Sequence, residues 1–145
     1  MPVKPFIFCC FLLVLSSCST VKKTTSGNFV DPEINNIVWQ VISFQGHPLD
    51  PSKFSNGLPN IVFNMQDGRI NGNDGCNSFM GLATYHKNVI KTGPIASTKM
   101  ACPGTDIAQD FYLQLSSPHL TYHLNDGTLR LFVNDAEVMA LKEKQ

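Results

Sequence analysis

A succession of short segments rich in β-branched and aromatic residues, each ended by a turn signal, constrains the fold of this chain most. The clearest pair lies near the C-terminus, where residues 119–124 and 128–133 flank the Asn-Asp-Gly sequence at 125–127. Asp-Gly supplies the positive φ angles that a tight hairpin turn requires. In the second segment apolar residues recur at every second position, the period of a half-buried strand. The sequence therefore predicts a β-hairpin here.

The same pattern predicts most of the remaining chain to be β. The expected strands are residues 36–44, 60–65, 69–72, 78–86, 89–92, 95–99 and 137–141. Residues 106–109 (Asp-Ile-Ala-Gln) instead have the form of a capping box, and apolar residues follow at helical spacing. This pattern predicts a helix over residues 105–116. We expect a mainly β (α+β) fold, a curved antiparallel sheet or partly open barrel with one packed helix.

The first residues of the chain carry the pattern of an export signal. Lys4 precedes an unbroken apolar run over residues 6–15, and two serines then lead to Cys18 and Ser19. The run is about half of the roughly 20 apolar residues that cross a bilayer, so a membrane-spanning helix is disfavoured. The pattern resembles the bacterial lipobox, in which Cys18 would become the first mature residue and carry lipid. Ser19 in place of aspartate favours the outer membrane by analogy.

These signals divide the chain into a signal peptide (1–17), a polar tether (18–33) and a globular domain (34–145). The domain has the length of a single core. Eleven basic and eleven acidic residues give a formal net charge of zero. Nucleic-acid binding is disfavoured because no basic stripe could neutralise many phosphates. Lipid rather than charge is expected to hold the protein on a membrane.

Two cysteines remain for the folded domain if Cys18 is lipidated and if Cys9 and Cys10 leave with the signal. An exported protein meets an oxidising compartment, so Cys76 and Cys102 are a candidate disulfide. Such a bridge would be worth about 3 kcal/mol in the chain-entropy model. The alternative is a pair of buried free thiols that pack as small hydrophobic groups.

Both cysteines lie in unusual clusters. Gly72, Gly75 and Gly81 surround Cys76 and Asn77, and glycines at this spacing allow sharp turns and close backbone approach. We expect the Asn77 side chain to bridge amides of the turn. The second cluster, residues 95–103, contains the other cysteine and leads directly into the predicted helix.

These clusters resemble the META/HslJ domain family of small bacterial envelope proteins. The resemblance covers residues 34–142 and rests on Gly-Cys-Asn at 75–77, Thr-Lys-Met-Ala-Cys at 98–102, Trp39, and the final hairpin. It implies a compact β-rich fold with one helix, associated with heat-shock and antibiotic-resistance phenotypes. It implies no established catalytic activity. One small departure lies in the helix segment, where the family often has an acidic residue and this chain has Gln109 followed by Asp110.

The residues favour neither catalysis nor metal binding. A nucleophilic Cys76 would need a base, and His47, His86, His119 and His123 belong to no recognisable cysteine-hydrolase signature. The cysteines and histidines lack the short spacing of a zinc site. Turn and capping roles account for the scattered aspartates. The aromatic residues are expected to form the core, or in part an apolar groove: Trp39, Phe44, Phe63, Phe79, Phe111 and Phe132.

The sequence therefore predicts a lipid-anchored envelope protein with a non-catalytic interaction or stress-related domain. No cofactor and no metal are expected, and the expected partners are the membrane and an unidentified envelope protein. The alternative is a carrier of a lipid or other small apolar ligand, which would require an apolar cavity between the sheet and the helix. An enzyme is the third possibility, and it would require Cys76 or another nucleophile within reach of a base.

Overall fold

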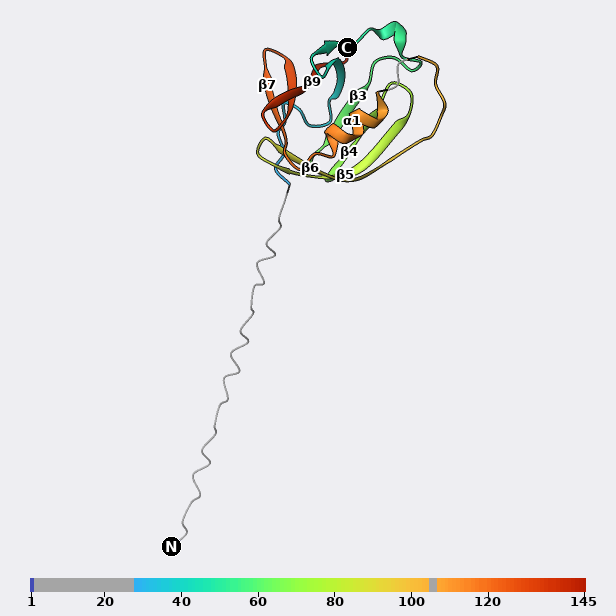
Figure 1. Cartoon of the computed structure of the whole chain (residues 1–145). Helices are drawn as coiled ribbons and strands as arrows, with labels where there is room; N and C mark the ends of the chain where they lie inside the picture. The colour runs from blue at the N-terminus through green and yellow to red at the C-terminus, as the bar shows by residue number, and fades with distance from the viewer. Residues whose placement is uncertain (2–27, 105–106) are drawn as a thin grey trace.

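The computed structural model describes residue 1, residues 28–104 and residues 107–145, and these form the arrangement in Figure 1. Nine strands, one α-helix and a short 3-10 helix follow one another along the described chain. They are β1 (Val38–Phe44), β2 (His47–Pro48), η1 (Pro51–Lys53), β3 (Asn60–Asn64), β4 (Arg69–Asn73), β5 (Ser78–His86), β6 (Val89–Ser97), α1 (Ala108–Leu115), β7 (Leu120–Asn125), β8 (Thr128–Val133) and β9 (Ala136–Glu143).

All strands belong to one curved antiparallel sheet in the order β2-β1-β3-β4-β5-β6-β7-β8-β9. Strand β1 also pairs with β9, which brings the two ends of the sheet together. The pairing of β6 with β7 covers only two residue pairs, so the barrel is only partly closed. Helix α1 lies beside this seam, where the Thr92 hydroxyl donates to the Leu115 carbonyl at 2.8 Å. The predicted fold class is confirmed.

The turns form where the sequence indicated. Asp126 and Gly127 have φ angles of 50° and 67°, which a tight turn between twisted antiparallel strands requires. Asn134 and Asp135 adopt the same left-handed region, at 49° and 66°, and join β8 to β9. The predicted C-terminal hairpin is confirmed, and a second hairpin follows it directly.

Side chains fill the space between helix α1 and the sheet. Phe111 and Leu115 are fully buried on the inner face of the helix. The Phe111 ring lies 5.7 Å from that of Phe79 and 6.3 Å from that of Phe44, between ring centroids. The contact with Phe79 is edge-on, an arrangement of aromatic rings that is favourable beyond their burial. The predicted core aromatics are buried with the exception of Phe132, which is half-buried and packs against His123.

Three sequence-based details are corrected. The helix begins at Ala108, and its N-cap, Ile107, makes no side-chain capping bond; the expected cap, Asp106, lies outside the described residues. The segments expected at 89–92 and 95–99 are one strand, β6, whose register shifts opposite residues 81–83. This irregularity lets the strand continue past Pro94, which lacks an amide N–H. His119 lies in the turn before β7 and not on the strand.

The domain extends further toward the N-terminus than expected. Residues 28–33, which we call the N-terminal strap, lie against the sheet. The Phe29 amide donates to the Tyr85 carbonyl at 3.0 Å, and the Tyr122 hydroxyl donates to Asp31 Oδ2 at 3.0 Å. Residues 28–33, which the sequence assigned to the tether, therefore make tertiary contacts with the sheet.

The predicted lipidation site, Cys18, and the expected signal peptide lie outside the described residues. Within residues 28–104 and 107–145, no helix has the length and apolar character needed to span a bilayer.

Candidate functional site

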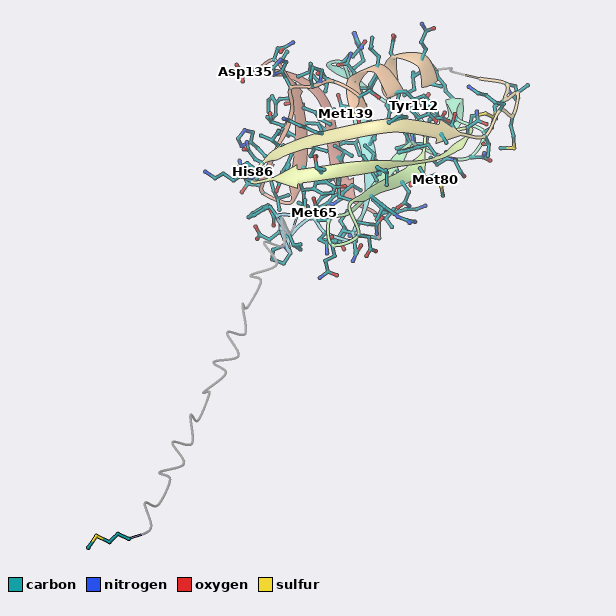
Figure 2. All side chains as sticks on the ribbon, turned by 90° about the horizontal axis from the view of Figure 1, so that it is seen from below. Met65, Met80, His86, Tyr112, Asp135 and Met139 are labelled. Atoms are coloured by element: carbon teal, nitrogen blue, oxygen red, sulfur yellow. A yellow bond between two sulfur atoms is a disulfide. The ribbon has the colours of Figure 1, made fainter. Side chains whose placement is uncertain are left out.

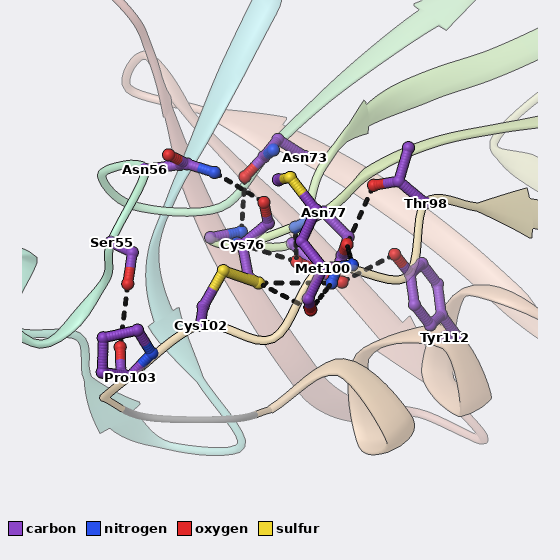
Figure 3. The surroundings of a disulfide bond; sticks show 12 residues. Ser55, Asn56, Asn73, Cys76, Asn77, Thr98, Met100, Cys102, Pro103 and Tyr112 are labelled. Carbon is purple, nitrogen blue, oxygen red and sulfur yellow. Dashed lines mark hydrogen bonds between the residues drawn. A yellow bond between two sulfur atoms is a disulfide. The ribbon is translucent and has the colours of Figure 1, made fainter.

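A disulfide joins the two cysteine-containing segments at one end of the sheet (Figure 3). Cys76 lies in the turn between β4 and β5, and Cys102 lies in the connection from β6 to α1. Their Cα atoms are 5.9 Å apart, and the bridge spans 26 residues of sequence. The structure thus favours the disulfide over the pair of free thiols.

Asn77 joins the same two segments through hydrogen bonds. Its Oδ1 accepts from the Thr98 hydroxyl at 2.8 Å and from the Met100 amide at 2.7 Å, and its Nδ2 donates to the Met100 carbonyl at 3.3 Å. We expected Asn77 to bridge amides of its own turn. Its side chain instead fixes the second segment alongside the first (Figure 3).

Asp74 performs the turn role expected of Asn77. Its Oδ1 accepts from the backbone amides of Cys76 at 2.9 Å and Asn77 at 2.6 Å, and Oδ2 accepts from the Tyr112 hydroxyl at 2.7 Å. Asp74 is only 3% exposed and is the one buried acidic side chain among the described residues. Burial, and then the hydrogen bond to Asp74, raise the pKa of Tyr112 above its ordinary value.

The contact between Asp74 and Tyr112 could not be predicted from the sequence. An aspartate two residues before a cysteine is a recognisable turn residue, and the turn role was foreseen. The partner of Oδ2 lies on helix α1, 38 residues away. No local pattern connects them, so only the tertiary structure identifies this contact.

Two glycines of the first cluster are required by close packing. A Cβ atom at Gly72 would lie 2.0 Å from the Asn60 carbonyl oxygen, across the β3–β4 pairing. Gly75 has a φ of +97°, and a Cβ there would lie 2.3 Å from the Phe54 ring. Both sites therefore exclude a side chain. Gly81 lies in the middle of β5, opposite Ile70 and Ile95, and is not part of the disulfide turn.

A groove of about 680 Å³ runs between the disulfide-linked segments and the start of α1. We call it the disulfide groove. Polar atoms of Asn77, Thr98 and Gln109 line it together with the exposed side chain of Met100, which is 55% exposed. The remaining described lining residues are Asp74, Cys76, Ser97, Lys99, Ala101, Cys102, Ile107, Ala108 and Tyr112. Its walls offer hydrogen-bond donors and acceptors beside apolar surface.

All four histidines are exposed and lie on other parts of the molecule. None of them is among the described residues that line the disulfide groove. Both cysteine sulfurs there are held in the disulfide, so neither is a thiolate nucleophile while the bridge is intact. In the part of the chain that the structure describes, no three histidine, cysteine, aspartate or glutamate side chains cluster as a metal site would require.

The family model for the META domain matches residues 32–145. This chain therefore belongs to the META domain family, which confirms the resemblance seen in its motifs. No curated protein matches the sequence.

Two solved structures share the fold. An NMR structure of a protein from Burkholderia xenovorans is 15% identical, covers 86% of this chain and 99% of its own, and has a TM-score of 0.62. A second NMR structure is 20% identical, covers 79% and 96% of the two chains, and has a TM-score of 0.61. At these identities the similarity establishes the fold alone.

Proposed function

We propose that this protein is a non-catalytic interaction module held on the bacterial cell envelope by a lipid on Cys18. The observation that carries the proposal is the disulfide groove. A covalent bridge and the Asn77 side chain hold its two walls in one arrangement, and Met100 and Lys99 present exposed side chains there. A preorganised surface of this kind binds a partner with little loss of conformational entropy.

The position of the groove agrees with an anchor at the N-terminus. Strand β5 begins at Ser78, beside the disulfide turn, and ends at His86, next to the strap residue Phe29. Nine residues of β-strand span about 30 Å. The chain therefore enters the domain at one end of β5, and the groove lies at the other. A protein tethered through Cys18 would present the groove away from its attachment point.

The alternative function, a carrier of an apolar ligand, receives less support. Such a carrier would need an apolar cavity between the sheet and α1, and Phe111 and Leu115 fill that space. The disulfide groove has polar walls and opens to the surface. This combination suits a peptide or protein segment better than a lipid chain.

An enzymatic role also receives less support. A cysteine hydrolase needs a free thiolate beside a base, whereas both described cysteines form a disulfide and every histidine lies outside the groove lining. The outer membrane remains the expected location by analogy, because Ser19 and not aspartate follows Cys18.

Anchorage is tested by intact-mass analysis and by cell fractionation of a Cys18→Ala variant. We expect the native protein to carry a diacylglyceryl mass on Cys18 and to sediment with membranes, and the variant to become soluble. An unmodified Cys18, or a variant that stays on the membrane, would contradict the anchor.

The interaction role is tested by site-specific photo-crosslinking in living cells. A crosslinking residue at Met100, in the groove, should give a discrete adduct with an envelope protein. The matched control is Asp135, which is exposed in the β8–β9 turn and lies outside the groove. The same adducts from both positions, or none from Met100, would count against the groove as a binding surface.

A further inference from the structure

A second feature of the surface lies on the outer side of the sheet. Met80 and Leu82 point outward from β5 and are 63% and 65% exposed, whereas their neighbours Phe79 and Ala83 are buried. Pro94 on β6 lies beside them, and together they line a hollow of about 410 Å³. We call this surface the outer face of β4–β6. Figure 2 labels Met80 on it, with His86 at the far end of the same strand.

Basic side chains lie next to this apolar surface. Arg69 on β4 pairs with Leu82 in the sheet register, and Lys91 on β6 pairs with Thr84. Both are exposed, and the one salt bridge among the described residues joins Arg130 to Glu137 elsewhere. A single acid, Asp67, lies in the adjoining β3–β4 turn. Apolar side chains flanked by cations match the boundary between acyl chains and anionic headgroups.

The N-terminal strap places this face close to the proposed anchor. Asn28 lies against the β3–β4 turn, where its Nδ2 would be 2.9 Å from a Cβ on Gly68, the residue before Arg69. Phe29 bonds to Tyr85 on β5. Asn28 lies ten positions after Cys18, and ten extended residue steps span at most about 35 Å. That reach is about one diameter of a domain this size, so a lipid on Cys18 would hold this face at high local concentration near the bilayer.

We propose that the outer face of β4–β6 docks onto the anionic bilayer surface to which Cys18 is attached. Met80 and Leu82 enter the interfacial region, and Arg69 and Lys91 contact lipid phosphates. This inference rests on the proposed lipid anchor. It goes further, because an anchor alone leaves the orientation of the domain open. The disulfide groove, at the end of β5 away from the strap, stays accessible to a partner in this orientation.

Methionine oxidation provides a test with an internal reference. Met80 and Met100 are both exposed, whereas Met65 and Met139 are buried. The full-length lipidated protein is placed in vesicles of phosphatidylethanolamine and phosphatidylglycerol and treated with dilute hydrogen peroxide. Mass spectrometry then follows the oxidation of each methionine. Relative to the Cys18→Ala protein with the same vesicles, we expect Met80 to oxidise about fivefold more slowly, and Met100 to be unchanged.

Charge variants separate lipid contact from general shielding. Arg69→Gln combined with Lys91→Gln should remove most of the protection of Met80. The matched control is Lys142→Gln combined with Lys144→Gln, two exposed lysines beyond this face, and it should keep the protection. Vesicles of neutral lipid alone should likewise give weaker protection, since the electrostatic attraction is absent.

Each possible failure has its own signature. If Cys18 carries no lipid by intact mass, the proposed anchor fails and the docking fails with it. If Cys18 is lipidated but Met80 oxidises as fast as in the Cys18→Ala protein, the anchor stands and the docking is refuted. If Met80 of the Cys18→Ala protein is protected without vesicles as protein concentration rises, the face binds a second copy of the chain, and membrane docking is again refuted.

Discussion

The two ends of the sheet use the same contact in different settings. At the groove end, the Tyr112 hydroxyl donates to buried Asp74; at the strap end, the Tyr122 hydroxyl donates to half-buried Asp31. The first contact lies beside a disulfide and completes a turn. The second contact joins residues 91 positions apart and holds the N-terminal strap against the sheet. The groove end is therefore fixed covalently, whereas the strap end depends on hydrogen bonds and packing alone.

Removal of the disulfide should lower the stability of the protein the most. Replacing Cys76 and Cys102 with alanine should lower the free energy of unfolding by about 3 kcal/mol, because the unfolded chain regains the freedom of a 26-residue loop. Urea unfolding of wild type and variant measures the loss. Dithiothreitol should destabilise the wild type by a similar amount and leave the variant unchanged. Equal stability of oxidised and reduced wild type would contradict a structural role for the bridge.

The next largest loss of stability is expected when Asp74 or Asp31 is replaced with alanine, and the two losses should differ. Asp74→Ala leaves two turn amides and the Tyr112 hydroxyl without their acceptor in a buried site, and we expect a loss of about 2–3 kcal/mol. Asp31→Ala, at the less buried strap end, should cost about 1 kcal/mol. Chemical unfolding of both variants, with far-UV circular dichroism as a check on folding, decides the order. Equal losses would remove the distinction between the two ends.

Alkaline pH should have the smallest effect on stability, and both ends of the sheet should contribute to it. Burial raises the pKa of Tyr112 and of Tyr122 above the ordinary value of 10.0, and an aspartate acceptor adds to each shift. The folded state then keeps protons that the unfolded state releases, so stability is intact below about pH 10 and falls as pH rises above it.

Unfolding midpoints between about pH 8 and about pH 11 test this expectation. Tyr112→Phe and Tyr122→Phe should each flatten the alkaline decline, because each removes one group whose pKa differs between the states. An unchanged slope in both variants would assign the decline to other groups. A stability that rises with pH in this range would contradict the direction of the shifts.

Several parts of the molecule follow from local sequence. The Asp126-Gly127 turn forms because its residues tolerate positive φ angles, and strand β8 beside it alternates buried and partly buried positions. The disulfide pairing could be named because only two cysteines remained after Cys18 and the signal were set aside. The ends of the helix and strands were predicted less accurately, as the merged strand β6 and the late start of α1 show.

Other parts could not be predicted because they depend on contacts between distant residues. The docking of residues 28–33 was missed because this polar segment has no periodicity of its own, and its partners, Tyr85 and Tyr122, lie far along the chain. The role of Asn77 in joining the two cysteine segments was missed for the same reason. Asp74 and Asn77 are both common turn residues, and only the position of the second segment shows that the Asn77 side chain reaches across to it.

The sequence by itself determined that this chain forms a β-rich domain with one helix and a cysteine pair, because turn chemistry, alternation and composition act over a few residues. Only the tertiary structure decided where the chain enters the domain, which polar residue joins the two cysteine segments, and that the groove and the strap lie at opposite ends of β5. These properties depend on strand order and sheet curvature, which bring together residues that no local pattern connects.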